Sequence, residues 1–103
     1  EDGIATSTCL GFNEEAQVIN SQVADELLNV KGVRASFVAG RDETGQTAVS
    51  ARSLGDINVQ VIMEKIGGGG HLTTAGAQTE ESPEDAIQMI LSILESAKES
   101  EEK

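Results

Sequence analysis

Four consecutive glycines at positions 67–70 stand directly before the only histidine of the chain, His71. Residues 61–66 in front of them have the pattern of a helix, and one glycine is enough to end a helix. Glycine loses more conformational entropy on folding than any other residue, so the further glycines destabilise the fold unless something requires them. We therefore expect the backbone at this point to need the absence of side chains.

The glycine run is a candidate anion-binding loop. A glycine-rich turn can direct successive N–H groups at an anion, and phosphate oxygens can approach a backbone that has no side chains. Familiar phosphate loops precede a helix and gain from the positive end of its dipole, whereas this run follows a helix. The attraction would then come from the N–H groups, from His71 and from a turn at residues 72–76. The alternatives are a flexible connector or an extended helix cap, with a structural role for the histidine.

Arg52 is the second candidate phosphate ligand. It falls in a predicted strand, where alternation places it on the face opposite Val49 and Ala51. An arginine can hold a phosphate through two parallel hydrogen bonds. The alternative is a surface arginine paired with one of the 18 acidic residues. Ser50 and Ser53 flank it, either as further donors or as ordinary strand residues.

The balance of charge favours a small anionic ligand over a long one. The chain has 7 Lys and Arg against 18 Asp and Glu, a net charge of −11. A protein that binds a long polyanion generally presents a basic surface. With two Phe and no Trp or Tyr, the chain also lacks the aromatic rings on which single-stranded bases stack. A phosphate would be bound at one local site.

The residue types support binding better than catalysis. One histidine, one cysteine and no clustered aspartates provide no credible metal site, and no serine has a histidine beside it in sequence as a general base. Cys9 cannot form an internal disulfide, which favours a reducing, cytosolic setting and a buried thiol. No apolar segment approaches the roughly 20 residues of a membrane span. The chain begins without Met, so we expect a fragment of a longer protein.

The apolar patterns predict the order strand, helix, strand, strand, helix, glycine loop, strand, helix. Strands are expected at residues 4–10, 33–41, 47–54 and 75–80, with a hairpin loop at 42–46. Helices are expected from a cap at Asn13 to Gly32, from a cap at Asp56 or Asn58 to Ile66, and from a cap at Ser82 onwards. This order predicts an α/β (α+β) fold, with a single mixed sheet of about four to five strands packed by three helices.

Residues 50–78, "SARSLGDINVQVIMEKIGGGGHLTTAGAQ", resemble the DHH-associated C-terminal domain of the DHH phosphoesterases. The motifs of that family are matched by Arg52–Ser53, Asn58–Val59, the Gly-Gly-Gly-His at 68–71 and the Ala-Gly-Ala at 75–77. Thr73 and Thr74 stand where many relatives carry other residues. The flanking segments look like those of the membrane-anchored cyclic di-AMP phosphodiesterases, which combine PAS, degenerate GGDEF and DHH domains.

The resemblance implies that residues 1–103 are a DHH-associated substrate-binding domain, the C-terminal fragment of a larger protein. A separate DHH domain would carry the Mn²⁺ ions and hydrolyse cyclic di-AMP to linear pApA, so this chain alone would hold no metal and no catalytic residue. The residues carried over as ligands of the substrate's phosphate or nucleotide are Arg52, Ser53, Gly68, Gly69, Gly70 and His71.

The resemblance also implies the partners and the location. The partners would be a cyclic dinucleotide or a short linear oligonucleotide and the DHH domain of the same chain, and a homodimer of the parent protein is left open. The domain would be cytoplasmic, in a membrane-anchored bacterial protein, without touching the membrane itself. Two alternatives stay open: the nucleic-acid-binding domain of a RecJ-like exonuclease or nanoRNA oligoribonuclease/phosphatase, and an interaction or dimerisation domain without a ligand.

Overall fold

The computed structural model describes residues 3–13, 16–42 and 44–101, and the side chains of residues 3–8, 18–42 and 44–96. Its elements are β1 (Ile4–Asn13), α1 (Ala16–Leu28), β2 (Ala35–Asp42), β3 (Thr47–Ser53), α2 (Val59–Lys65), β4 (Gly69–Gly70), β5 (Thr74–Thr79) and α3 (Pro83–Glu101). The strands form one five-stranded sheet in the order β1-β2-β3-β5-β4. β1 runs parallel to β2, and the other neighbours are antiparallel. The predicted α/β class, with one mixed sheet and three helices, is confirmed.

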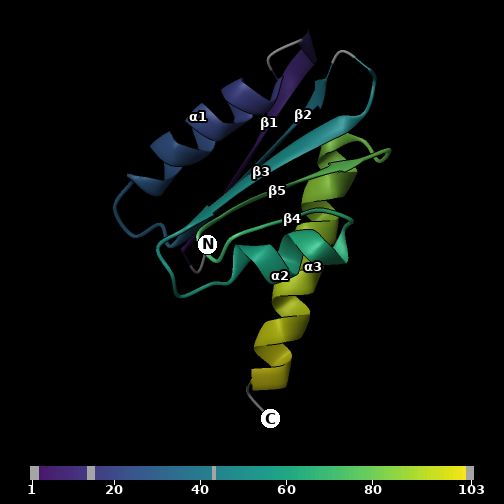
Figure 1. Ribbon diagram of the computed structural model, residues 1–103. Coiled ribbons are helices and arrows are strands. Elements are labelled where there is room, and N and C mark those ends of the chain that lie inside the picture. The colour runs from purple at the N-terminus through teal and green to yellow at the C-terminus, as the bar shows by residue number, and fades with distance from the viewer. Residues whose placement is uncertain (1–2, 14–15, 43, 102–103) are drawn as a thin grey trace.

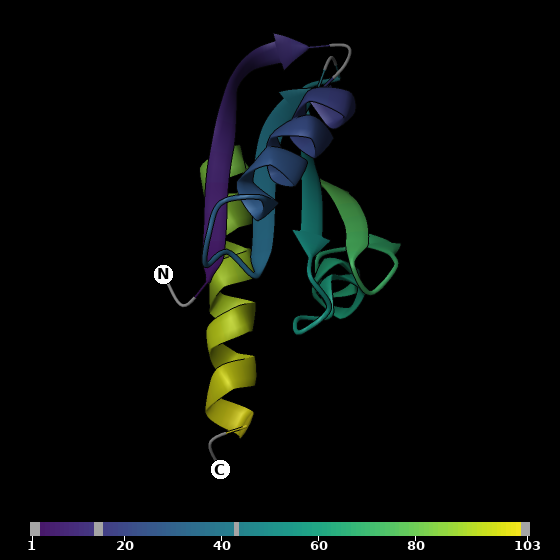
Figure 2. The ribbon, with the colours of Figure 1, turned by 90° about the vertical axis from the view of Figure 1, so that its left-hand side faces the viewer.

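The helices lie on both faces of the sheet (Figure 1). α1 lies over β1, β2 and β3 on one face, whereas α2 and α3 pack on the other. Figure 2 shows the same layers turned by 90°, with α1 and α3 on opposite sides of the strands. On the α1 face, β5 and β4 extend beyond the helix, which leaves an open surface next to it.

The hydrophobic core lies between the sheet and the pair α2 and α3. Its largest fully buried side chains include Phe37 and Val49 from the sheet, Val59 and Met63 from α2, and Ile90 from α3. Alternation along β2 and β3 directs every second side chain into this layer. The helices predicted after Asn58 and after Ser82 are therefore confirmed, and both pack against the sheet.

The opposite layer, between α1 and the sheet, contains two buried hydrogen bonds beside apolar side chains such as Val38. The Asn20 amide donates to the Ala48 carbonyl oxygen at 2.9 Å, and the Ser36 hydroxyl donates to the Ala24 carbonyl oxygen at 2.7 Å. Both side chains are fully buried. Because hydrogen bonds depend on direction more than apolar contacts do, they fix where α1 crosses the strands.

Two of the three N-terminal helix caps predicted from the sequence are confirmed. The Asn58 side chain accepts from the Val61 N–H to cap α2, and the Ser82 hydroxyl accepts from the Asp85 N–H to cap α3. Asn13, the cap predicted for the first helix, belongs to β1 instead, and α1 begins at Ala16. Cys9 lies in β1, as expected, but its side chain is outside the described ones.

In the described residues, no helix combines the length and the apolar character that crossing a bilayer requires.

Candidate functional site

The first glycine of the run ends α2. Gly67 has a φ of +96°, its N–H donates to the Glu64 carbonyl at 3.2 Å, and the Gly68 N–H donates to the Met63 carbonyl at 2.7 Å. These are the two hydrogen bonds of a Schellman motif, which needs a left-handed residue after the helix. The predicted glycine cap is confirmed, and its two N–H groups are used to close the helix.

Two more glycines are required by close backbone contacts with β5. A β-carbon at Gly68 would lie 2.1 Å from the Gly76 carbonyl oxygen, and one at Gly70 would lie 2.5 Å from the Cα of Ala75. Gly70 also has a φ of +145°. Gly69 differs, because a β-carbon there would meet none of the described atoms within 4 Å. The fold therefore explains three of the four glycines and leaves Gly69 without a structural reason.

The second half of the glycine run, Gly69–Gly70, is the short edge strand β4 rather than part of the predicted loop. Gly69 pairs with Gly76 and Gly70 with Ala75, and the His71 N–H donates to the Thr74 carbonyl at 2.7 Å. Hydrogen-bonded and non-hydrogen-bonded pairs alternate in an antiparallel ladder, so the N–H of Gly70 points away from β5. The N–H groups of Gly67, Gly68 and His71 all donate within the protein. The interpretation that successive amides of this run clasp an anion is therefore wrong for these three groups.

His71 and Arg52 come together on the sheet. Arg52 pairs with Thr74 across β3 and β5, and the hydrogen bond from His71 to Thr74 extends this row by one strand. Two strand spacings correspond to roughly 10 Å between the backbones of Arg52 and His71. The His71 side chain is exposed, and among the described residues its imidazole has no hydrogen-bond partner.

The Arg52 side chain is fixed at both ends of its guanidinium group. Nε donates to Asp25 Oδ1 at 2.9 Å, and Nη1 donates to the Ala51 carbonyl at 2.9 Å. The Arg52 side chain is only 15% exposed, whereas Asp25 is 63% exposed. The pairing with a carboxylate, which the sequence left open as an alternative, is thus present, and it leaves other N–H groups of the arginine free of protein partners within the described part.

Ser53 lies on the other face of β3 from Arg52. It is 4% exposed, and its hydroxyl accepts a hydrogen bond from the Gly55 N–H at 2.8 Å. This contact closes the turn that follows the strand. The structure therefore brings Arg52, the glycine strand and His71 to one region, and turns Ser53 away from it.

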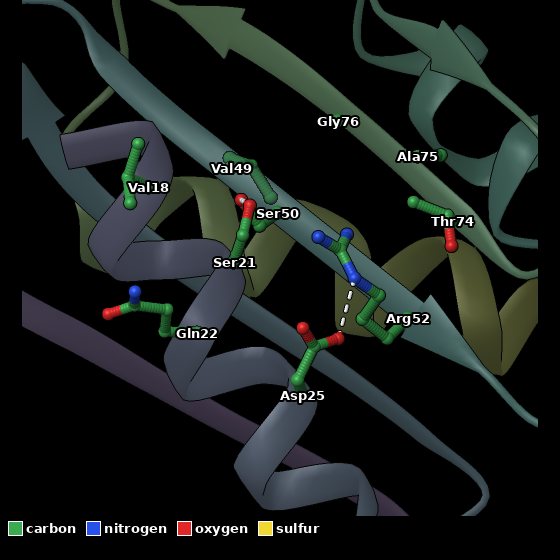
Figure 3. Close-up of a pocket in the computed structure, with 10 residues that line it drawn as sticks. All are labelled: Val18, Ser21, Gln22, Asp25, Val49, Ser50, Arg52, Thr74, Ala75 and Gly76. Carbon is green, nitrogen blue, oxygen red and sulfur yellow. Dashed lines mark hydrogen bonds and ion pairs between the residues drawn. The ribbon is translucent and has the colours of Figure 1, made fainter. Parts of the chain in front are cut away.

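A groove of about 510 Å³ runs beside Arg52, between α1 and the uncovered part of the sheet (Figure 3). It is lined by Val18, Ser21, Gln22, Asp25, Val49, Ser50, Arg52, Thr74, Ala75 and Gly76. The four residues from α1 are spaced i, i+3, i+4 and i+7, so they form one stripe of the helix.

The α1 stripe and Thr74 were not among the residues predicted from the sequence. The sequence does contain a helical spacing that groups the four α1 residues. It indicates only that these side chains share one face of the helix. Thr74 could be assigned to the Arg52 face only with the register of β5 known.

No group of three or more His, Cys, Asp or Glu side chains that could hold a metal ion occurs among the residues with a described position. The side chains in this part of the chain therefore do not fit a Mn²⁺ site, and the resemblance assigns the Mn²⁺ ions to a separate DHH domain.

The comparisons with known proteins agree on one family. The model of the DHHA1 domain matches residues 2–100. The cyclic-di-AMP phosphodiesterases GdpP of Geobacillus thermodenitrificans and PdeA of Listeria monocytogenes are 54% and 52% identical over 76% and 75% of this chain. GdpP of Bacillus subtilis is 48% identical over 76% of the chain. The matched part is 12% of the length of each of these three relatives.

Solved structures share the fold at low identity. An exopolyphosphatase-related protein from Bacteroides fragilis superposes with a TM-score of 0.71 and 21% identity, over 93% of this chain and 29% of that one. The pGpG-specific phosphodiesterase PggH from Vibrio cholerae gives a TM-score of 0.50 and 18% identity, over 63% of this chain and 24% of that one. Because the family model matches residues 2–100, the chain belongs to the DHHA1 domain family.

Proposed function

We propose that this domain binds the phosphate and nucleotide parts of cyclic di-AMP for a phosphodiesterase that yields linear pApA. Hydrolysis itself is assigned to a DHH domain of the same chain, outside these 103 residues. The domain's share of catalysis is to position the substrate and to neutralise part of its charge.

The observation that carries this proposal is the placement of Arg52. It stands on the wall of an open groove, largely buried, with part of its guanidinium group unused by the described residues. In a chain with a net charge of −11, a local cation of this kind favours the binding of an anion. Thr74 and His71 continue the row from Arg52 across the sheet and add a hydroxyl and an imidazole.

The relatives support the choice of substrate. Three proteins named cyclic-di-AMP phosphodiesterases are 48–54% identical to this chain over about three quarters of its length. A solved relative with the same fold is named for a linear dinucleotide, pGpG. Cyclic di-AMP and pGpG both contain two nucleosides and two phosphates. The groove, together with the row of polar residues next to it, offers more than one position for a phosphate.

The location of the parent protein is also a proposal. We infer a cytoplasmic position for this domain within a membrane-anchored protein. Support comes from a phytoplasma relative, 47% identical over 60 residues, which is named as a membrane protein fused to ribosomal protein bL9.

The test is a competition on the full-length parent protein with Mn²⁺ supplied. We expect cyclic di-AMP to be hydrolysed with a higher kcat/KM than pApA or short single-stranded RNA, and pApA to accumulate. Preferred hydrolysis of RNA two to five nucleotides long would instead favour the oligoribonuclease alternative and overturn the proposal. If Arg52→Ala leaves kcat/KM for cyclic di-AMP unchanged, the groove beside Arg52 does not bind the substrate.

A further inference from the structure

α1 and β3 are joined beside the groove by two hydrogen-bonded pairs of side chains. The hydroxyl oxygens of Ser21 and Ser50 are 3.2 Å apart, and Asp25 accepts from Arg52 at 2.9 Å. Four residues along a helix span about 6 Å, and two residues along a strand span about 6.6 Å. The two elements therefore match in spacing, and the two pairs lie next to each other along the groove (Figure 3).

The Asp25 contact leaves Arg52 with a defined set of free donors. A guanidinium group has five N–H donors, of which Asp25 takes the one on Nε and the Ala51 carbonyl takes one on Nη1. The remaining donors belong to the two terminal nitrogens. In Figure 3 these nitrogens point along β3 towards Ser50 and Ser21, into the groove and away from Asp25.

The serine pair also has unused hydrogen-bonding capacity. Ser50 is 4% exposed, and in the described part of the chain its hydroxyl bonds only to that of Ser21. When one hydroxyl donates to another, the accepting hydroxyl keeps its own hydrogen. One O–H donor is therefore left at the position towards which the free nitrogens of Arg52 point.

We propose that α1 completes a phosphate subsite at Arg52, in which the Ser21–Ser50 pair donates to a phosphodiester oxygen that also accepts from the arginine. Asp25 is the positioning residue of this subsite, because its carboxylate fixes which edge of the guanidinium group faces the ligand. The inference rests on the proposed function and adds residues from outside the segment that carries the family motifs, which begins at position 50.

The direction in which Asp25 changes phosphate binding tests the inference, because two effects of its carboxylate oppose each other. A carboxylate beside the subsite also repels a phosphate and offsets the charge of Arg52. If repulsion is the main effect, removing the charge strengthens phosphate binding. If positioning is the main effect, removing the charge weakens binding, because a neutral amide oxygen at position 25 holds the Arg52 Nε–H less strongly than the carboxylate does, and the ligand must then order the arginine.

The experiment compares Asp25→Asn and Ser21→Ala in the full-length parent protein with cyclic di-AMP as substrate. We expect each variant to raise KM about fivefold, with kcat changed less than about twofold, as for the loss of a binding contact. Asp56→Asn is the matched control, since the Asp56 carboxylate is about as exposed as that of Asp25 and pairs with Arg34 at 3.0 Å outside the groove. Both aspartate variants should keep the Tm of the parent, because each carboxylate is more than half exposed and ion pairs of exposed carboxylates contribute little stability.

The outcomes separate the inference from the proposed function. Adding Asp25→Asn to Arg52→Ala should raise KM no further than Arg52→Ala does alone, because Asp25 acts through Arg52. The inference is overturned if Asp25→Asn leaves KM unchanged or lowers it, or if Ser21→Ala behaves like the Asp56 control, while Arg52→Ala still raises KM. If Arg52→Ala itself has no effect, the proposed function fails together with the subsite.

Discussion

Gly68 and Gly76 approach so closely that a β-carbon at Gly68 would lie 2.1 Å from the Gly76 carbonyl oxygen. This contact joins the residue after the α2 cap to the middle of β5. Both partners are backbone, so neither can turn aside as a flexible side chain would. The glycine run is thus needed in large part for packing, because the absence of side chains lets β4 lie beside β5.

Gly68→Ala should destabilise the domain strongly. The added methyl group must displace backbone in either α2 or β5, and overpacking of this kind typically costs about 1–3 kcal/mol. We expect the free energy of unfolding, measured by urea denaturation, to fall by about 2 kcal/mol or more. A loss below about 0.5 kcal/mol would contradict the close approach between Gly68 and Gly76.

Gly69→Ala is the matched variant, and it separates folding from ligand binding. Position 69 has no positive φ, and a methyl group added there would meet no described atom within 4 Å, so stability should change by less than about 1 kcal/mol. If a ligand approaches the bare backbone here, KM of the full-length protein for cyclic di-AMP should still rise about fivefold or more. An unchanged KM would remove Gly69 from the candidate site.

Local patterns predicted most of the fold. Apolar periodicity indicated the three helices and four of the five strands, and capping chemistry indicated Asn58 and Ser82. Two features were not predicted because they depend on which segments pair in the sheet, which no single segment's pattern shows. β5 inserts between β3 and β4, and only that pairing turns Gly69–Gly70 into a strand.

The candidate site was predicted in part, for the same physical reason. Alternation correctly placed Arg52 on the face opposite Val49 and Ala51, and the same rule already assigns Ser53 to their face. The stripe of α1 that includes Asp25 could not be assigned to Arg52, because no local pattern says which strand a helix crosses. The buried bonds from Asn20 and Ser36 determine that crossing.

Ser53→Ala should affect stability and spare substrate binding. The buried hydroxyl accepts from the Gly55 N–H, and losing one such hydrogen bond typically costs about 1 kcal/mol. We expect a lower Tm and a KM for cyclic di-AMP within about twofold of the parent. A KM raised about tenfold without loss of stability would show that Ser53 contacts the substrate despite its orientation.

Asp42 should make stability fall in acid. The Thr44 hydroxyl holds the pKa of this carboxyl below its ordinary 3.8, with help from the Thr44 and Gln46 N–H groups and Gln78, while burial acts in the opposite direction. Because the folded pKa is the lower one, the stabilisation is complete above the unfolded pKa and is lost as pH falls through the folded value.

The comparison with Asp42→Asn isolates this effect from the titration of the other carboxylates. At pH 6 the parent should have the higher Tm, because the asparagine oxygen accepts the Thr44 and Gln46 N–H groups without a charge, and its amide nitrogen does not accept from Gln78. The difference should shrink below a pH of about 4 and close at lower pH. A difference that stays constant from pH 6 to pH 3 would show that the hairpin contacts do not depend on the ionised carboxylate.

His71→Ala should lower kcat/KM for cyclic di-AMP by about tenfold or more in the full-length protein. The imidazole is exposed at the end of the row that runs from Arg52 through Thr74, and it has no hydrogen bond to the described residues, so an N–H group of the ring is available to a phosphate oxygen. Bound manganese, measured by atomic emission, should not change, because no metal-binding group includes His71 in the described region. Thr73→Ala is the control, since the exposed Thr73 contributes only its carbonyl, to the Ser53 N–H. Near-normal turnover of His71→Ala would exclude the imidazole from substrate binding and leave the site to Arg52.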